Sequence, residues 1–223
     1  MSKRITIVED ILSSNEKIAV KNRAKLDAAG VLAINLMASP GAGKTSLIEQ
    51  TLRRLQPKIK IAVIDGDIAT DIDAKRAEAA GAIAVQINTG GQCHLDANMI
   101  GAALGEIFLD QIDLLIVENV GNLICPAGFD LGVHQNVLIA SIPEGDDKPY
   151  KYPGMYRDVD VLVINKIDLM PYIAFDLDYF GQGVEVLNPN LLTFPVSCKT
   201  GEGLDSWLDW LISKTLDKRS YSD

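Results

Sequence analysis

A short stretch in the first quarter of the chain combines flexible, cationic and hydroxyl residues in one run. It reads Ala38-Ser39-Pro40-Gly41-Ala42-Gly43-Lys44-Thr45, follows an apolar run at 31–37 and precedes a helical pattern that begins Ser46-Leu47-Ile48. Glycines here let backbone N–H groups come close to an anion, and the start of the following helix favours negative charge. This context and spacing are typical of a phosphate-binding P-loop.

The side chains of this loop predict how a bound nucleotide would be held. Lys44 is expected to contact the β and γ phosphate oxygens, and Thr45 to offer its hydroxyl to Mg²⁺. Ala38 stands where the usual pattern has its first glycine, so we expect the start of the loop to differ slightly. The residues expected to surround the phosphates are Gly41, Ala42, Gly43, Lys44, Thr45 and Ser46.

A second motif predicts which base the nucleotide carries. Asn165-Lys166-Ile167-Asp168 directly follows the apolar run 161–164, at the strand end where doubly wound sheets bind ligands. The Asp168 carboxylate can accept two hydrogen bonds from guanine, whereas adenine presents no matching pair of donors. Ser197-Cys198-Lys199 resembles the base-supporting loop of GTPases, so GTP is favoured. The predicted base-binding residues are Asn165, Lys166, Asp168, Ser197 and Lys199.

Carboxylates end two further apolar runs and are candidates for Mg²⁺ binding and hydrolysis. Asp67 and Glu118 are interpreted as Mg²⁺-linked groups near the γ-phosphate, with turn or N-cap roles as the alternative for each. Asp73 could orient the attacking water, although capping of the helix that begins Thr70-Asp71-Ile72-Asp73 is an equal alternative. Together with Lys44, these residues predict GTP hydrolysis.

Two cysteines and a histidine form a possible site for a transition metal. Cys93 and His94 follow the apolar run 82–87, and Cys125 comes shortly after Glu118. Thiolate and imidazole suit Ni²⁺ and Zn²⁺ but do not decide between them. From the residues alone, ordinary roles as a buried thiol and a hydrogen-bonded imidazole remain an equal alternative.

The geometry of such a metal site is constrained by the spacing of its ligands. Neighbouring side chains point apart on a strand, so Cys93 and His94 must lie in a loop or serve different chains. Three groups do not complete a tetrahedral shell. A site shared between two subunits would supply four thiolates from two copies of Cys93 and Cys125, with His94 adding or exchanging. Cys198 and His134 are interpreted as structural.

These motifs need elements that hold them in place, and the hydrophobic pattern predicts such elements. A helix over 5–29, ended by Gly30, precedes seven short apolar runs that alternate with helical patterns. A final helix, 204–216, has Trp207 on its apolar stripe, and both tryptophans are assigned to the core. The most loop-like stretch is 143–154. The seven runs are 31–37, 59–64, 82–87, 112–117, 137–142, 159–164 and 191–196.

The alternation predicts an α/β fold with a mostly parallel central sheet flanked by helices, that of a P-loop NTPase. At 223 residues the chain fits one GTPase domain, with residues 1–30 as a helical lead-in and 31–216 as the G domain. The formal net charge of −9 argues against a nucleic-acid binder. No apolar run is long enough to cross a bilayer, and an odd number of cysteines, three, argues against a disulfide framework. A cytoplasmic location is therefore expected.

With these residues assembled, the chain resembles the HypB family of hydrogenase nickel-incorporation GTPases over nearly its full length. The segments that carry the resemblance are 39–45, Gln92-Cys93-His94-Leu95-Asp96, 118–126 and 144–153. The resemblance implies a metallochaperone GTPase of the SIMIBI class that helps to insert nickel into NiFe-hydrogenase. It also implies a homodimer with Cys93, His94 and Cys125 at the subunit interface, a HypA-like nickel-binding accessory protein, and the hydrogenase large-subunit precursor as partners.

The resemblance leaves some alternatives open. Residues 1–6 contain neither a Cys-rich nor a His-rich stretch, so nickel delivery is expected to depend on the Cys/His site or on a partner. A urease-type nickel accessory GTPase has a related P-loop but typically a Cys-Pro-His segment, whereas Cys93 and His94 are adjacent. A GTP-switched dimerising regulator with structural zinc is another alternative. A kinase would need an acceptor pocket and a basic lid, neither of which is identified.

Overall fold

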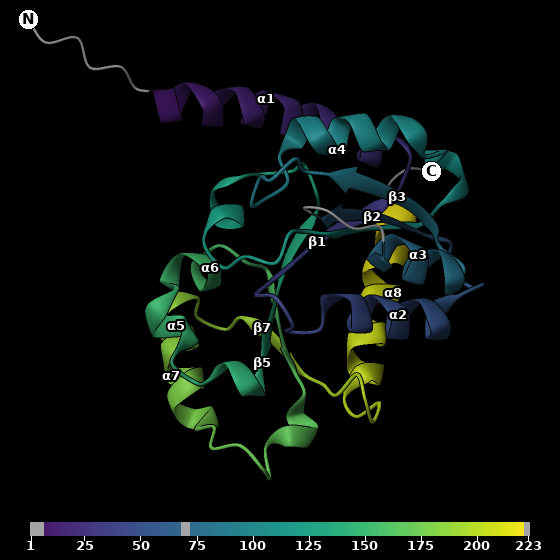
Figure 1. Ribbon diagram of the computed structural model, residues 1–223. Helices are drawn as coiled ribbons and strands as arrows, with labels where there is room; N and C mark the ends of the chain where they lie inside the picture. Colours follow the sequence, from purple (N-terminus) through teal and green to yellow (C-terminus); the bar gives the residue numbers. More distant parts are fainter. Residues whose placement is uncertain (1–6, 68–71, 221–223) are drawn as a thin grey trace, which may run out of the picture.

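A single seven-stranded parallel sheet forms the centre of the molecule (Figure 1). The computed structural model describes residues 7–67 and 72–220. The strand order is β3-β2-β4-β1-β5-β6-β7, and every neighbouring pair is parallel. The strands are β1 Leu32–Ala38, β2 Ile61–Asp67, β3 Ile83–Asn88, β4 Leu114–Glu118, β5 Gln135–Ser141, β6 Val161–Asn165 and β7 Leu192–Pro195.

The seven apolar runs are therefore confirmed as strands, and the predicted fold class is confirmed. Strands β1, β4 and β6 are buried at every position, because helices cover both faces of the sheet there. The edge strands β3 and β7 are partly exposed along their length. An edge strand has a neighbour on only one side, so its side chains are less completely covered.

Helices pack on both faces of this sheet (Figure 1). Alternate strand residues point to opposite faces, so Leu32, Ile34 and Leu36 meet the layer of α2, α3 and α8. The opposite face is covered by α1 and α4 over β2 and β4, and by α6 and α7 over β5 and β6. The α-helices are α1 Ile7–Ala28, α2 Lys44–Leu55, α3 Ile72–Ala79, α4 Ala97–Ala103, α5 Lys148–Lys151, α6 Pro153–Arg157, α7 Leu177–Leu187 and α8 Leu204–Ser220.

Short 3₁₀ helices occupy several connections between these elements. They are η1 Leu104–Glu106, η2 Leu109–Gln111, η3 Cys125–Gly128, η4 Ile142–Glu144 and η5 Ile167–Leu169. Among the residues that the structure describes, no helix is long and apolar enough to span a membrane.

The assignment of 143–154 as the most loop-like stretch is wrong. This segment contains the end of η4, all of α5 and the start of α6. Its prolines lie in the first turn of each helix, where the missing N–H has no intrahelical acceptor to lose. The final helix also runs four residues further than expected, to Ser220. Trp207 is fully buried as predicted, while Trp210 is half-buried and packs against the edge of the core.

Candidate functional site

The predicted phosphate loop joins the end of β1 to the start of α2. Gly41 and Gly43 have φ values of 78° and 106°, a region in which residues with a Cβ are strained. A Cβ on Gly43 would also overlap the Asn165 side-chain amide. The two glycines are therefore needed for the shape of this loop, as the sequence predicts.

The predicted base motif lies directly against this loop. The Asn165 amide donates to the Ala42 carbonyl at 2.9 Å, and Lys166 Nζ donates to the Gly41 carbonyl at 2.6 Å. Lys166 has a φ of 62°, which turns its side chain back over the loop. Strands β1 and β6 flank β5, so parallel topology brings segments about 120 residues apart in sequence together at one sheet edge.

Two adjoining pockets contain most of the predicted nucleotide-binding residues. A pocket of about 570 Å³ is lined by Lys44, Thr45, Asp67, Asp73 and Glu118, among others. A pocket of about 420 Å³ is lined by base-motif residues, Cys198 and Lys199. Both pockets include Gly43, Ser46 and Lys166, so together they form a continuous cleft along the P-loop.

Ser197 has a different position from the other predicted base-binding residues. It is fully buried, and its hydroxyl donates to Asp168 Oδ1 at 2.6 Å while accepting the Thr200 N–H at 3.1 Å. Ser197 therefore orients the Asp168 carboxylate. The Cys198 N–H contacts Asn165 Oδ1 at 3.3 Å, which ties this loop to the base motif.

Glu118 is a buried carboxyl group with a perturbed pKa at the edge of the cleft. It ends β4, is 4% exposed, and accepts a hydrogen bond from Thr45 Oγ1 at 2.8 Å. Burial raises the pKa of Glu118 to about 7, although Lys44 and the Thr45 hydrogen bond partly oppose this rise. The facing hydroxyl and carboxylate are the hard oxygen donors that Mg²⁺ prefers, so these two residues fit a Mg²⁺ ion.

Asp73 lies in the first turn of α3 and pairs with Arg76. Its carboxylate is 3.1 Å from Arg76 Nη1, and Arg76 Nε also contacts Glu49 at 2.9 Å. The other residues of the predicted helix start, Thr70 and Asp71, lie outside the described residues. Arg76 itself lines the pocket and was not predicted, because an exposed arginine on a helix carries no sequence motif.

The possible metal ligands come together within one chain. The donor atoms of Cys93, His94 and Cys125 all lie within 4.8 Å of one another. Cys93 and His94 lie in the loop between β3 and α4, as the spacing argument required, and Cys125 is the first residue of η3. The Phe129 ring packs on the His94 ring, with centroids 4.0 Å apart.

The pKa shifts at this cluster favour a protonated Cys93 thiol and a neutral His94 imidazole. A hydrogen bond with Cys125 and burial raise the pKa of Cys93, and burial lowers the pKa of His94. Two sulfur donors and one neutral nitrogen donor suit Zn²⁺ or Ni²⁺ and leave one position of a four-coordinate shell to another ligand.

A buried asparagine connects the nucleotide cleft with the Cys/His cluster. Asn119 follows Glu118 directly and is 2% exposed. Its Oδ1 accepts the N–H of Leu95, the residue after His94, at 3.1 Å. Its Nδ2 donates to Asn35 at 3.2 Å, which anchors it to β1. Sequence reasoning missed this residue, because a single asparagine after a strand resembles an ordinary turn residue.

The remaining cysteine and histidine make structural contacts. Burial raises the pKa of Cys198 to about 11, so its thiol is unreactive at neutral pH. His134 Nδ1 accepts the Ala33 N–H at 2.9 Å, and Nε2 lies 3.0 Å from Asp27. These contacts agree with the structural interpretation of both residues.

Comparison with known proteins places this arrangement in a family. Residues 32–194 match the family described as CobW/HypB/UreG, nucleotide-binding domain. The chain is 46% identical over 212 residues to hydrogenase maturation factor HypB of Azotobacter vinelandii, covering 94% of this chain and 69% of that protein. It is 45% identical over 207 residues to probable hydrogenase maturation factor HypB of Methanocaldococcus jannaschii, covering 93% and 94% respectively.

A solved structure agrees with this assignment. The crystal structure of HypB from Helicobacter pylori in complex with nickel superposes with a TM-score of 0.87 at 35% identity, covering 92% of this chain and 97% of that one. The identity and coverage of these matches exceed what a shared fold alone would give. The chain therefore belongs to the CobW/HypB/UreG family of nucleotide-binding proteins, as a member of its HypB group.

Proposed function

We propose that this protein is a GTP-hydrolysing metallochaperone that assists nickel insertion into NiFe-hydrogenase. The observation that carries the proposal is the direct connection between two sites. Glu118 faces the P-loop, and the next residue, Asn119, accepts a hydrogen bond from the segment that bears Cys93 and His94. The nickel-bound structure of a relative and the maturation-factor names of others support nickel as the cargo.

The nucleotide cleft has a defined role for each group. Backbone N–H groups of Gly41 to Ser46 hold the phosphates, Lys44 neutralises the β and γ oxygens, and Asp168 accepts the guanine donors while Ser197 orients it. Thr45, Asp67 and Glu118 would hold Mg²⁺, which would supply positive charge beside the γ-phosphate. Asp73 is proposed to orient the attacking water. We propose residues 1–30 as a lead-in and 31–216 as one G domain.

Nucleotide state is proposed to control the metal site through Glu118 and Asn119. With Mg²⁺ and GTP bound, Glu118 would be held as the carboxylate, its proton released to solvent, and the end of β4 would be fixed. Movement there reaches Leu95 through the Asn119 amide and reaches Cys125 along the same chain segment. GTP binding favours a homodimer, in which the second subunit supplies or exchanges a metal ligand, and hydrolysis reverses the pairing. A HypA-like nickel-binding protein and the hydrogenase large-subunit precursor are the proposed cytoplasmic partners.

The first test is a paired measurement of Ni²⁺ stoichiometry and molar mass. Protein loaded with GDP is compared with protein loaded with a non-hydrolysable GTP analogue, by titration and light scattering. We expect the analogue to promote dimers and to change Ni²⁺ affinity. The Cys93→Ala/Cys125→Ala protein should keep its nucleotide affinity and lose Ni²⁺, while Lys44→Ala should lose nucleotide affinity.

The outcomes separate the proposal from its main alternative. Equal mass and equal metal affinity in both nucleotide states would exclude nucleotide-gated nickel transfer. Tight Zn²⁺ binding that is indifferent to nucleotide, together with nucleotide-dependent dimers, would instead favour a GTP-switched regulator with a structural zinc. Two thiols and one imidazole suit that ion equally well.

A further inference from the structure

The buried face of α1 carries two asparagines that bond to backbone far away in sequence. Asn15 and Asn22 are seven residues apart, so they lie on the same side of the helix two turns apart. They are 7% and 1% exposed. A polar side chain is costly to bury unless its hydrogen bonds are made, and both side chains make them.

The first anchoring point of these asparagines is Ala97, at the start of α4. The Ala97 N–H donates to Asn15 Oδ1 at 2.8 Å, and the Ala97 carbonyl accepts from Asn22 Nδ2 at 2.7 Å. Both backbone groups of this residue are therefore held by α1. Ala97 comes three residues after His94, and buried Leu95 and the helix cap Asp96 lie between them.

The second anchoring point is the segment that follows the other metal ligand. Asn15 Nδ2 donates to the Asp130 carbonyl at 2.7 Å and Asn22 Nδ2 to the Leu131 carbonyl at 3.2 Å. Arg23 Nε donates to the next carbonyl, that of Gly132, at 3.0 Å. Asp130 comes five residues after Cys125. Helix α1 thus bonds to both ligand-bearing segments at once.

The packing at these contacts is close. Gly132 has a φ of 83°, and a Cβ there would overlap the Ala19 carbonyl on the same face of α1. A Cβ on Gly101 of α4 would lie 3.0 Å from Asn22 Oδ1. Glycines at both positions let the backbone approach the helix closely enough for the asparagines to reach it.

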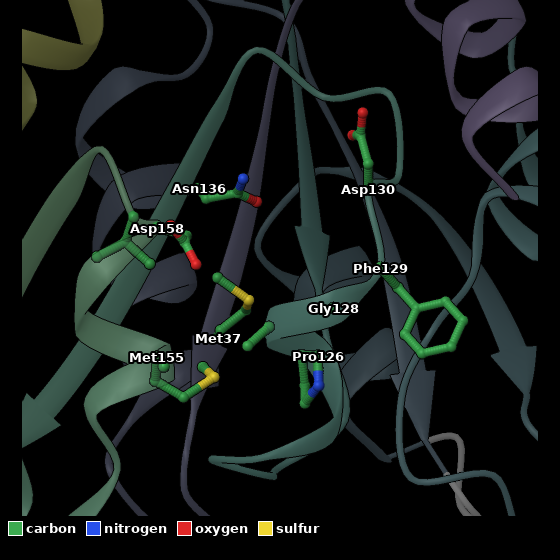
Figure 2. Close-up of a pocket in the computed structure, with 11 residues that line it drawn as sticks. Met37, Pro126, Gly128, Phe129, Asp130, Asn136, Met155 and Asp158 are labelled. Carbon is green, nitrogen blue, oxygen red and sulfur yellow. The ribbon is translucent and has the colours of Figure 1, made fainter. Parts of the chain in front are cut away.

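On its other side the Cys125 segment faces a hollow. Figure 2 shows a pocket between η3 and α6, with Pro126 and Gly128 on one wall, Met155 on the other, and Phe129 pointing away from it. The pocket has a volume of about 230 Å³ and includes Met37 of β1. A hollow therefore lies between part of η3 and α6, whereas hydrogen bonds from α1 hold residues 130–132, which follow η3.

We propose that Asn15 and Asn22 are positioning residues for the Cys93–His94–Cys125 metal site. The inference rests on the proposed metal-binding function and adds the elements that hold its ligands. The ligands come from two segments outside the sheet, so their meeting within 4.8 Å needs something to fix the segments relative to each other. The two amides do so, which reduces the conformational entropy that metal binding must remove.

The test measures metal binding by Asn15→Ala, Asn22→Ala and the double variant. Affinities for Ni²⁺ and for Zn²⁺ are measured by competition with a chelator, and the sulfur-to-nickel charge-transfer absorption is recorded on each folded protein. Removal of outer groups that orient ligands typically weakens metal binding 10- to 100-fold, and we expect a loss of this size with an altered charge-transfer band.

Asn188→Ala is the matched control. Asn188 Nδ2 also donates to two backbone carbonyls, of Tyr156 and Val159, at 3.2 and 2.8 Å, but it lies at the end of α7. It should lose comparable stability and keep both metal affinity and absorption band. If the asparagine variants and this control have the same metal affinity and spectrum as the unmodified protein, the positioning role is wrong.

Two further measurements keep the result interpretable. Should the double variant fail to fold, hydrogen exchange on the unmodified protein is compared with and without Zn²⁺. Reciprocal coupling requires slower exchange within α1 when metal binds, and unchanged exchange would overturn the inference. The Cys93→Ala/Cys125→Ala protein separates the two levels. If that protein still binds metal, the proposed metal site is wrong. If it loses metal while the asparagine variants bind metal normally, only the positioning role is wrong.

Discussion

Single residues in the nucleotide cleft are held under constraints that a purely structural role would not need. Glu118 is a carboxyl buried near the carboxylates of Asp65 and Asp73, and Lys44 and the Thr45 hydroxyl partly offset this cost. Burying a charge without full compensation costs free energy. A buried carboxyl at this position therefore suits a group that binds the cation accompanying the nucleotide. Gly43 is constrained in a different way, by its backbone conformation and by the Asn165 amide that abuts it.

The raised pKa of Glu118 predicts how stability varies with pH in nucleotide-free, Mg²⁺-free protein. The folded protein holds the proton up to about pH 7, whereas the unfolded chain releases it near pH 4.5. The folded state therefore binds more protons in this interval, and the free energy of unfolding should fall as pH rises from 4.5 to 7. The loss from this group is on the order of 3 kcal/mol.

Urea unfolding across this pH range measures the effect, and Glu118→Gln provides the comparison. Glutamine cannot ionise, so the variant should lack this decline and be the more stable protein at pH 8. Parallel pH profiles for the two proteins would contradict the assignment.

Gly43→Ala and Gly41→Ala test the loop geometry as a pair. Both substitutions place a Cβ at positive φ, which costs about 1 kcal/mol or more. Only the Gly43 substitution also displaces Asn165, because a Cβ on Gly41 meets nothing within 4 Å. We expect GTP affinity to fall at least about tenfold further for Gly43→Ala, a difference of about 1.4 kcal/mol, measured by calorimetry. Equal losses would argue against the Asn165 contact.

At the scale of elements, the end of β4 and the loop before α4 act as one unit. Asn119 is held by Asn35 of β1 on one side and accepts the Leu95 N–H on the other, so it links a rigid strand to a loop. The nucleotide cleft and the Cys/His cluster are therefore connected through hydrogen bonds of buried groups, which are stronger than exposed ones.

Asn119→Ala should uncouple the two sites. The variant leaves the metal ligands and the P-loop residues in place but removes the acceptor for Leu95. We expect the ratio of metal affinities between analogue-loaded and GDP-loaded protein to approach one. Asn35→Ala is the control, because it retains the Asn119–Leu95 bond and should keep most of the ratio. An unchanged ratio in Asn119→Ala would place the coupling elsewhere.

At the scale of the whole molecule, net charge bears on self-association. Each chain carries a formal charge of −9 before any nucleotide is bound. Two such chains repel each other over about a Debye length, roughly 10 Å at 0.1 M salt, and added salt screens this repulsion.

The proposed homodimer should therefore tighten with ionic strength. Sedimentation of analogue-loaded protein at 0.05 M and 0.5 M NaCl measures the change in dimer dissociation constant. We expect a several-fold decrease in that constant at the higher salt concentration. Weaker pairing at high salt would mean that ion pairs across the interface outweigh the net repulsion.

The fold was largely predictable because its signals are local. The strands appear as seven short apolar runs, and the helix around Trp207 appears as a stripe with helical periodicity. The glycines before Lys44 reflect a backbone requirement of the loop. The same local signals were misleading at 143–154, where prolines indicate a loop but lie in the first turns of short helices. Helix α7, one of the helices that alternate with the strands, contains two glycines that lower helix propensity, and its packing sustains it.

What the sequence determined by itself is the chemistry of the sites: which side chains can contact phosphate, base or metal, and that parallel strands bring their carboxyl ends to one edge. Only the tertiary structure decided which of these groups meet and what supports them. Cys93 and Cys125 converge because β3 and β4 lie on either side of β2. The roles of Asn15, Asn22 and Asn119 depend on hydrogen bonds to backbone groups 24 to 115 residues away. Such long-range contacts depend on packing in three dimensions, and they produce no periodic pattern in the amino-acid sequence.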